Sequence, residues 1–399
     1  MNQQPIISRK INWRGATLLL VIGVVLMAMT LRLPLTVVGP IIQLIGSDLN
    51  ISNALAGFLT TIPLLAFAVV SPFVPRISRK LGIELSLFLS MILLAVGISL
   101  RSVGITSLLL IGTVLIGVAI SFGNVLLPSF FKLKFPLHVG LMMGIYSVAM
   151  NVSGGFGAGL SHPIAESYGW QLALAFPIMI VGIACAMWAP QLKNNERLQQ
   201  ATSDAPKLQL WRSPLAWAVT LAMGLQSFIF YTTGAWLPAI FVSQGMPPDK
   251  AGWMVAIMLL AQLPLTFIMP VLADKLANQR PIVIILTVLY SLGFIGIALG
   301  LTDYTVLWMI CIGCAGGSSF SLAMMLFTLR TKTAYAAADL SGFAQAIGYL
   351  LAASGPVTFG WLYDYFGSWQ IAIYVLLFVV VILFSSGWYA AGNKYVEDQ

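Results

Sequence analysis

Arg32 is the residue of this sequence whose type and position most clearly indicate chemistry. It lies 18 residues after Arg14 in an apolar run, which places it about 27 Å along a helix that rises 1.5 Å per residue. An arginine near a membrane surface can extend its side chain to water. Here apolar residues continue from Leu35 to Ile45, so we expect Arg32 to lie deep and to face a cavity.

The sequence provides no carboxylate at the depth of Arg32. The acidic residues closest to apolar runs all fall at the ends of those runs; they are Glu84, Glu166, Asp274, Asp339 and Asp364. A buried cation without a resident carboxylate needs another compensating charge. The planar fork of arginine donors suits an anion or a concentrated negative oxygen. The sequence therefore predicts a bound small solute, anionic or polar, at Arg32.

Other polar and aromatic side chains at similar depth complete the predicted substrate-binding site. Such groups either mark a solute pathway or join helices by hydrogen bonds. Besides Arg32, the candidates are Asn124, Asn151, Gln226, Tyr231, Gln262, Gln345 and Tyr349. Trp236 is a weaker candidate, because tryptophans gather at membrane interfaces. Neither His138 nor His162 is placed as a central proton relay.

Motifs for catalysis, nucleotides or metals are missing from the sequence. It has no phosphate-binding loop of the Gly-x-x-x-x-Gly-Lys type and no cluster with metal-ligand spacing. The pair Cys311 and Cys314 is expected to pack as small residues inside a helix rather than to do redox or metal chemistry. We expect no catalytic residue, no cofactor and no metal, so the protein is predicted not to be an enzyme.

The composition then defines the surroundings of these residues. Only 8% of the 399 residues are charged and 59% are hydrophobic, with a mean hydropathy of +0.94. A soluble protein carries about 25% charged residues, so a soluble globular protein is excluded. The basic residues occur in short clusters between apolar runs, which is typical of membrane topology and not of a nucleic-acid-binding face.

Apolar runs between charged or turn-forming clusters predict twelve membrane spans. They must be helices, because sheet edges cannot face hydrocarbon, and the first run is expected to remain as a span rather than to be cleaved as a signal peptide. The spans are 14–40, 53–74, 83–101, 104–131, 138–161, 169–190, 213–242, 250–272, 281–300, 304–329, 339–362 and 368–392.

The distribution of basic residues predicts the orientation of these spans. Seventeen of the 20 Lys and Arg residues fall on the side of the N-terminus, the C-terminus and the central connection, and only Arg32, Arg101 and Lys250 do not. By the positive-inside rule, both termini are expected to be cytoplasmic. We expect a multi-pass protein of a bacterial inner membrane, functional as a monomer in the lipid bilayer.

The two halves of the sequence resemble each other. Ala56-Gly57 returns as Ala251-Gly252, and Lys132-x-Lys134 corresponds to Arg330-x-Lys332. Six spans repeated in parallel around a polar loop are the pattern of a major facilitator transporter. We therefore expect an all-α fold with two pseudo-symmetric six-helix bundles, 1–190 and 213–399, joined by a cytoplasmic loop at 191–212.

The loop signature of that superfamily is present with one departure. Leu272-Ala273-Asp274-Lys275 resembles its acidic-basic turn, whereas Arg79 occupies the position where the first half of the signature has Asp. That Asp normally holds the inner gate closed by charge pairing. We expect a different gate network in the first half, with Glu84 as the partner of Arg79.

Several longer motifs resemble the bacterial family of cyanate and 2-nitroimidazole transporters. They are TLR at 30–32, GP at 39–40, LTTIPLLAFA at 59–68, GNVLLP at 123–128 and SGFAQAIGYL at 341–350. The resemblance covers both halves, from about residue 14 to residue 390. It implies a twelve-helix inner-membrane carrier for a small polar or anionic compound, and Arg32 and Asn124 fall inside the shared motifs.

The leading functional hypothesis is a secondary active or facilitated transporter that moves a cyanate-like anion by alternating access, with Arg32 and neutral donors holding it near the midplane. A second hypothesis is efflux of 2-nitroimidazole-like or other drug-like compounds, with Tyr231, Tyr349 and Trp236 as a stacking surface. A third is a membrane sensor that binds a ligand without transporting it.

Overall fold

The computed structural model describes residues 15–197 and 208–399, and within them the chain is helical without a β-strand. The helices are α1 (Gly15–Thr36), α2 (Ile42–Asp48), α3 (Asn53–Val70), α4 (Val74–Leu81), α5 (Ile83–Arg101), α6 (Thr106–Lys134), α7 (Val139–Tyr168), α8 (Trp170–Ala175), α9 (Pro177–Trp188), α10 (Pro214–Ser243), α11 (Pro248–Lys275), α12 (Arg280–Ala298), α13 (Thr305–Leu329), α14 (Ala334–Phe366) and α15 (Gln370–Ala390).

Each of the twelve apolar runs corresponds to one or two of these helices. The second run, 53–74, corresponds to α3, and α4 follows it from Val74 at an angle of 63°. The sixth run consists of α8 and α9, which separate where Pro177 begins α9. Ten helices of the described residues are long and apolar enough to span a membrane, or eleven with the bent pair. The more polar α14, with 33 residues, completes the predicted twelve-helix fold.

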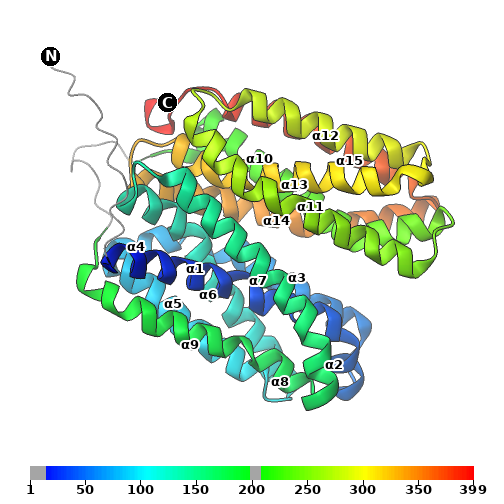
Figure 1. The fold of residues 1–399 in the computed structure, drawn as a ribbon, viewed down its shortest axis with the longest axis horizontal. Helices are drawn as coiled ribbons and strands as arrows, with labels where there is room; N and C mark the ends of the chain where they lie inside the picture. The colour runs from blue at the N-terminus through cyan, green and yellow to red at the C-terminus, as the bar shows by residue number, and fades with distance from the viewer. Residues whose placement is uncertain (1–14, 198–207) are drawn as a thin grey trace.

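The helices form two bundles that lie one above the other in Figure 1, with α1–α9 in the lower bundle and α10–α15 in the upper one. The start of α1 and the C-terminus lie at the same end, which we call the termini side. Helices α5 and α12 both contain 19 residues and begin at residues 83 and 280. These matching lengths and spacings agree with the repeat seen in the sequence.

The two bundles contact each other mainly through α7 with α11 and through α3 with α14. On the termini side these contacts are very close: a Cβ added to Gly140 would lie 2.6 Å from Pro270 O, and one added to Gly342 would lie 2.7 Å from Ser71 O. Farther along α7, Gly155 and Gly159 have no atom within 4 Å of such a Cβ. Among the described residues, these close contacts between the bundles lie on the termini side, and α7 has open space farther along.

The C-terminal residues secure the connection between α13 and α14. Glu397 accepts hydrogen bonds from the backbone N–H of Lys332 and of Thr333, at 2.7 and 3.2 Å. The Lys332 ammonium donates to Asp398, and this hydrogen bond raises the pKa of Lys332. Val396 is buried and its N–H donates to Arg330 O. The second bundle is thus bound together at its termini-side end.

Candidate substrate-binding site

A small polar pocket lies at mid-depth where helices of both bundles meet. Its volume is about 30 Å³. Of the residues predicted from the sequence, it brings together one from α1, one from α7, two from α10, one from α11 and one from α14. These are Arg32, Asn151, Gln226, Tyr231, Gln262 and Tyr349. Six of the eight residues proposed from the sequence therefore line one pocket.

Arg32 is half-buried on the wall of this pocket. It lies near the middle of a continuous apolar helical stretch, Leu18–Asp48, which agrees with the deep position expected from the sequence. Its guanidinium lies over the ring of Phe230, 5.1 Å from the ring centroid. Gly154 on α7 leaves room for the side chain, because a Cβ there would lie 2.8 Å from Arg32 Cγ.

Several polar side chains of the pocket form no hydrogen bond to other described groups of the protein. Within the described part of the chain, Arg32, Tyr231, Gln262 and Tyr349 form no side-chain hydrogen bond or ion pair. By contrast, Asn151 donates to Ser147 O at 2.8 Å. The uncommitted groups all carry N–H or O–H donors. These donors line a cavity where a ligand can reach them, so the pocket can donate hydrogen bonds to a solute that presents acceptor oxygen atoms.

Asn124 and Gln345 lie outside the pocket lining, on its termini side, and their substrate contact remains a prediction. Gln345 Nε2 donates to Asn124 O across the two bundles at 3.0 Å and to Ser341 Oγ at 2.8 Å. Tyr146 donates to Asn124 Oδ1 at 3.3 Å. Both residues are buried. In this conformation they join the bundles beneath the pocket.

A much larger cavity, which we call the vestibule, continues from the pocket away from the termini side. Its volume is about 550 Å³. It shares Arg32, Asn151, Phe230, Tyr231 and Gln262 with the pocket, so the two cavities adjoin. The rest of its lining comes largely from the halves of α3, α7, α11 and α14 that are far from the termini side. A solute reaching Arg32 from that side passes through the vestibule.

A second arginine, Arg101, also lines the vestibule. In the sequence, Arg101 stands out only as one of three exceptions to the charge pattern. The structure buries it, with 1% of the side chain exposed. Its guanidinium donates to Pro34 O at 2.7 Å and to Leu174 O at 3.4 Å. Because Pro34 belongs to the last turn of α1, Arg101 supplies a cation where helix carbonyls lack partners. Only a tertiary contact reveals this role.

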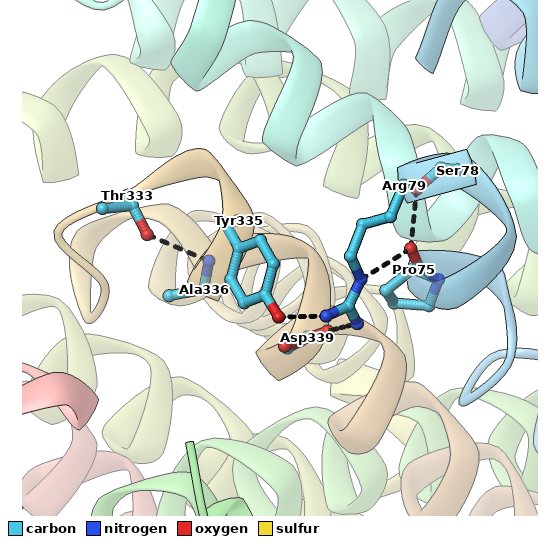
Figure 2. Close-up of polar contacts among 7 residues, drawn as sticks. All are labelled: Pro75, Ser78, Arg79, Thr333, Tyr335, Ala336 and Asp339. Atoms are coloured by element: carbon cyan, nitrogen blue, oxygen red, sulfur yellow. Dashed lines mark hydrogen bonds and ion pairs between the residues drawn. The ribbon is translucent and has the colours of Figure 1, made fainter. Parts of the chain in front are cut away.

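The termini side is closed by an ion pair between the bundles. Figure 2 shows the Arg79 guanidinium of α4 directed at the first turns of α14, where it meets Asp339 Oδ1 at 2.7 Å and the hydroxyl of Tyr335. The prediction that Glu84 is the partner of Arg79 is wrong. Glu84 pairs instead with Lys134 at 2.9 Å and accepts from the N–H of Glu196. Gly82, with φ 96°, separates α4 from α5, and Glu84 in the first turn of α5 contacts residues of its own bundle.

The symmetry-related contact uses backbone atoms. Asp274 Oδ2, at the end of α11, accepts from the N–H of Gly140 at 3.1 Å, in the first turn of α7. An acceptor at this place satisfies an unpaired helix N–H and complements the helix dipole. Nearby, Lys132 Nζ donates to Thr328 O at 2.6 Å and to Thr331 O, at the end of α13. Together with the Arg79–Asp339 pair, these contacts close the path to the termini side.

The remaining residues considered from the sequence lie away from the pocket. Trp236 donates to Pro356 O at 2.8 Å and lines neither cavity. Cys311 and Cys314 are free thiols, and Cys314 Sγ approaches Ala261 O at 3.6 Å on the neighbouring helix. His162 lies near Glu166 at 3.6 Å, with half of its side chain exposed.

The arrangement of two bundles around a midplane pocket agrees with the comparisons to known proteins. A model of the Major Facilitator Superfamily matches residues 18–331 and 227–396. The uncharacterized transporter YycB of Bacillus subtilis (strain 168) is 42% identical over 381 residues, covering 94% of both chains. The 2-nitroimidazole transporter of Escherichia coli (strain K12) is 34% identical over 382 residues, covering 95% of this chain and 97% of the relative.

Two further similarities extend this result. The cyanate transport protein CynX of Escherichia coli (strain K12) is 27% identical over 334 residues, covering 83% of this chain and 86% of the relative. Among solved structures, the proton:xylose symporter XylE bound to 6-bromo-6-deoxy-D-glucose superposes with a TM-score of 0.77, at 14% identity, and covers 96% of this chain and 98% of that one. At that identity the structural likeness supports the fold alone.

The relatives are transporters, and the family and the apolar helices are those of a multi-pass membrane transporter rather than an enzyme. The chain belongs to the Major Facilitator Superfamily, in the family of the cyanate and 2-nitroimidazole transporters.

Proposed function

We propose that the protein is a secondary transporter that carries a small anionic or oxygen-rich polar solute by alternating access, with Arg32 as the principal binding group. The observation that carries this proposal is the set of uncommitted donors around Arg32. A guanidinium at membrane depth without a carboxylate partner is costly. A solute oxygen that accepts from Arg32, Gln262 and Tyr349 would relieve that cost when it binds.

The distribution of contacts supports an outward-facing conformation. If the termini are cytoplasmic, as the basic residues predict, then the Arg79–Asp339 pair closes the cytoplasmic side and the vestibule faces the periplasm of a bacterial inner membrane. Loading from the outside would precede closure of the vestibule, and separation of Asp339 from Arg79 would follow. The proposal treats one chain as the functional unit, because the pocket is built within a single chain.

The substrates named for the relatives share one chemical property. Cyanate is a small anion, and the nitro group of 2-nitroimidazole carries two partly negative oxygens. Both can accept hydrogen bonds from an arginine fork. The 2-nitroimidazole relative, together with Phe230 and Tyr231 at the mouth of the pocket, favours efflux of a nitro-aromatic compound as a second candidate function. Both candidates use the same site and differ in the size of the solute.

The test is ligand-dependent thermal stability of the purified protein. The panel contains cyanate, bicarbonate, nitrate, acetate and 2-nitroimidazole, each titrated against wild type, Arg32→Ala and the control Arg76→Ala, an exposed arginine of α4. A ligand that binds the folded state raises the midpoint temperature of unfolding, and the rise increases with the ligand concentration. We expect at least one oxyanion to stabilise wild type and the control but not Arg32→Ala. Equal stabilisation of all three proteins would refute the role of Arg32.

Flux in proteoliposomes completes the test. The solute that stabilises the protein is expected to cross the membrane in wild-type vesicles and not in Arg32→Ala vesicles. Stabilisation by 2-nitroimidazole alone, lost in Arg32→Ala, would support the efflux candidate at this site. Stabilisation by 2-nitroimidazole that is unchanged in Arg32→Ala would make Arg32 a structural residue. The sensor hypothesis requires binding without flux, so measured flux removes it.

A further inference from the structure

The two adjoining cavities differ in both size and chemistry, and this difference bears on the shape of the solute. The pocket at Arg32 has a volume of about 30 Å³, which is roughly the share of one water molecule in the liquid. Into this space converge the donors of Tyr231, Gln262 and Tyr349. A compact group of three or four heavy atoms can approach these donors after small side-chain movements. A ring cannot enter the pocket in this conformation.

The vestibule, by contrast, has room for a ring or an alkyl chain. Its volume of about 550 Å³ lies within the usual range for binding sites of small organic molecules. Apolar side chains from four helices form much of its wall; among them are Leu35, Leu59, Leu64, Leu260, Leu263 and Val357. Phe230 belongs to both cavities and lies at the boundary between the polar and the apolar part.

We infer that the solute is amphipathic: a compact oxyanion head, such as a carboxylate or nitro group, binds at Arg32 while an aromatic or short aliphatic tail lies in the vestibule against Phe230 and the leucines. This inference rests on the proposed function and adds a tail to it. The polar groups fix the orientation of the head. The tail supplies affinity, because removing apolar area from water is favourable.

A head without a tail uses only part of this site. A triatomic anion such as cyanate would leave the apolar wall of the vestibule in contact with water until the bundles close. Each buried methylene is worth about a fourfold change in affinity. The inference therefore predicts that affinity rises with the apolar area of the tail, up to the size that the vestibule accommodates.

The experiment is a homologous series of carboxylates, from formate through acetate and butyrate to benzoate, titrated against the full chain in nanodiscs. Binding is measured by calorimetry or by the shift in thermal midpoint. We expect the dissociation constant of benzoate to be at least about 100-fold lower than that of formate, from the area of the phenyl ring. The variants Leu35→Ser and Leu263→Ser should weaken benzoate about tenfold and leave formate within about twofold.

The control variants distinguish the contribution of the tail to affinity from that of the head. Leu292→Ser changes a lipid-facing leucine of α12 that lines neither cavity, and it should leave the whole series unchanged. Arg32→Gln should weaken formate and benzoate alike. Affinity that is independent of tail length, or that Leu35→Ser and Leu263→Ser do not alter, would overturn the inference and leave the oxyanion site intact. Failure of every carboxylate to bind a folded wild type that still binds cyanate, nitrate or 2-nitroimidazole would overturn the inference alone. Failure of all of these ligands would overturn the proposed function as well.

Discussion

Arg79 and Asp339 form a 2.7 Å ion pair between the two bundles, and their charges are reversed relative to the symmetry-related contact. Residue 274, which follows Arg79 by 195 positions, is the aspartate that accepts from Gly140 N–H. In the second half the acid, Asp274, lies at the end of α11 and meets the N-terminus of α7. In the first half the acid, Asp339, lies near the start of α14, and α4 provides the cation. The contact between α4 and α14 thus depends on two side chains, whereas the contact between α11 and α7 depends on one side chain and a backbone N–H.

The first prediction concerns the Arg79–Asp339 pair. Its side chains are 27% and 18% exposed, so we expect Asp339→Asn to weaken closure by about 1 kcal/mol, roughly a fivefold change in the conformational equilibrium. The readout is maleimide labelling of Ser71→Cys in a protein without other cysteines, because Ser71 is fully buried where α3 meets α14. Labelling should be about fivefold faster in Asp339→Asn.

Two further variants test the cause of that change. The charge exchange Arg79→Asp with Asp339→Arg should restore slow labelling, because it recreates the pair with opposite polarity. Lys80→Gln, which changes an exposed cation on the next residue of α4, should have no effect. Labelling that stays fast in the double variant would show that the pair does not hold the gate.

The second prediction uses the close contact of α7 with α11. A Cβ at residue 140 would lie 2.6 Å from both Pro270 O and Asp274 Cβ, so Gly140→Ala forces the helices apart. Because these atoms include the backbone, the strain cannot be relieved by one side chain. We expect labelling of Ser71→Cys to increase by about tenfold. Gly159→Ala on the same helix, where space is open, should behave as wild type.

The twelve-helix fold was predictable from the sequence because lipid imposes a simple rule. Each apolar run must satisfy its own backbone and therefore forms a helix. The same rule does not give the bends: Val74 begins a separate α4, and α8 ends at Ala175 before Pro177 begins α9. The position of Arg32 also followed from the sequence, because a continuous apolar stretch surrounds it.

Partners across helices could not be predicted in the same way. Glu84 is close to Arg79 in sequence, yet it pairs with Lys134, because helix packing and not sequence distance sets which charges meet. Phe230 carries no signal that distinguishes it from the other aromatic residues of α10. Arg101 is the last residue of the predicted span 83–101. Its hydrogen bonds to two other helices depend on the assembled bundle, so the sequence does not reveal them.

The third prediction concerns the room that Gly154 leaves for Arg32. Gly154→Ala should displace the Arg32 side chain, since the new Cβ would lie 2.8 Å from Arg32 Cγ. We expect the dissociation constant of the anion proposed to bind at Arg32 to rise about tenfold, as one charge-assisted hydrogen bond is lost or lengthened. The neighbouring variant Gly155→Ala meets no atom within 4 Å and should bind normally. Equal affinities in the two variants would contradict this packing role.

The fourth prediction assigns Arg101 to stability. Arg101→Met removes donors from Pro34 O and Leu174 O in a buried setting. Leaving such carbonyls without partners costs about 1–3 kcal/mol, so the thermal midpoint should fall by roughly 4 °C. Circular dichroism of the purified variant measures this change. Ser99→Ala, an exposed position of the same helix, is the control. An unchanged midpoint in Arg101→Met would exclude the capping role.

The Arg32 guanidinium, which has no carboxylate partner among the described residues, has a kinetic consequence. When the vestibule closes over an empty pocket, the Arg32 charge is enclosed without a counter-charge, whereas a bound oxyanion neutralises it. The unloaded carrier should therefore reorient more slowly than the loaded one. We expect one-for-one exchange of the anion across proteoliposomes to outpace its net uptake, and preloading the vesicles should accelerate entry. Under this regime, the transport rate in the cell would be set by the solute available on the receiving side of the membrane.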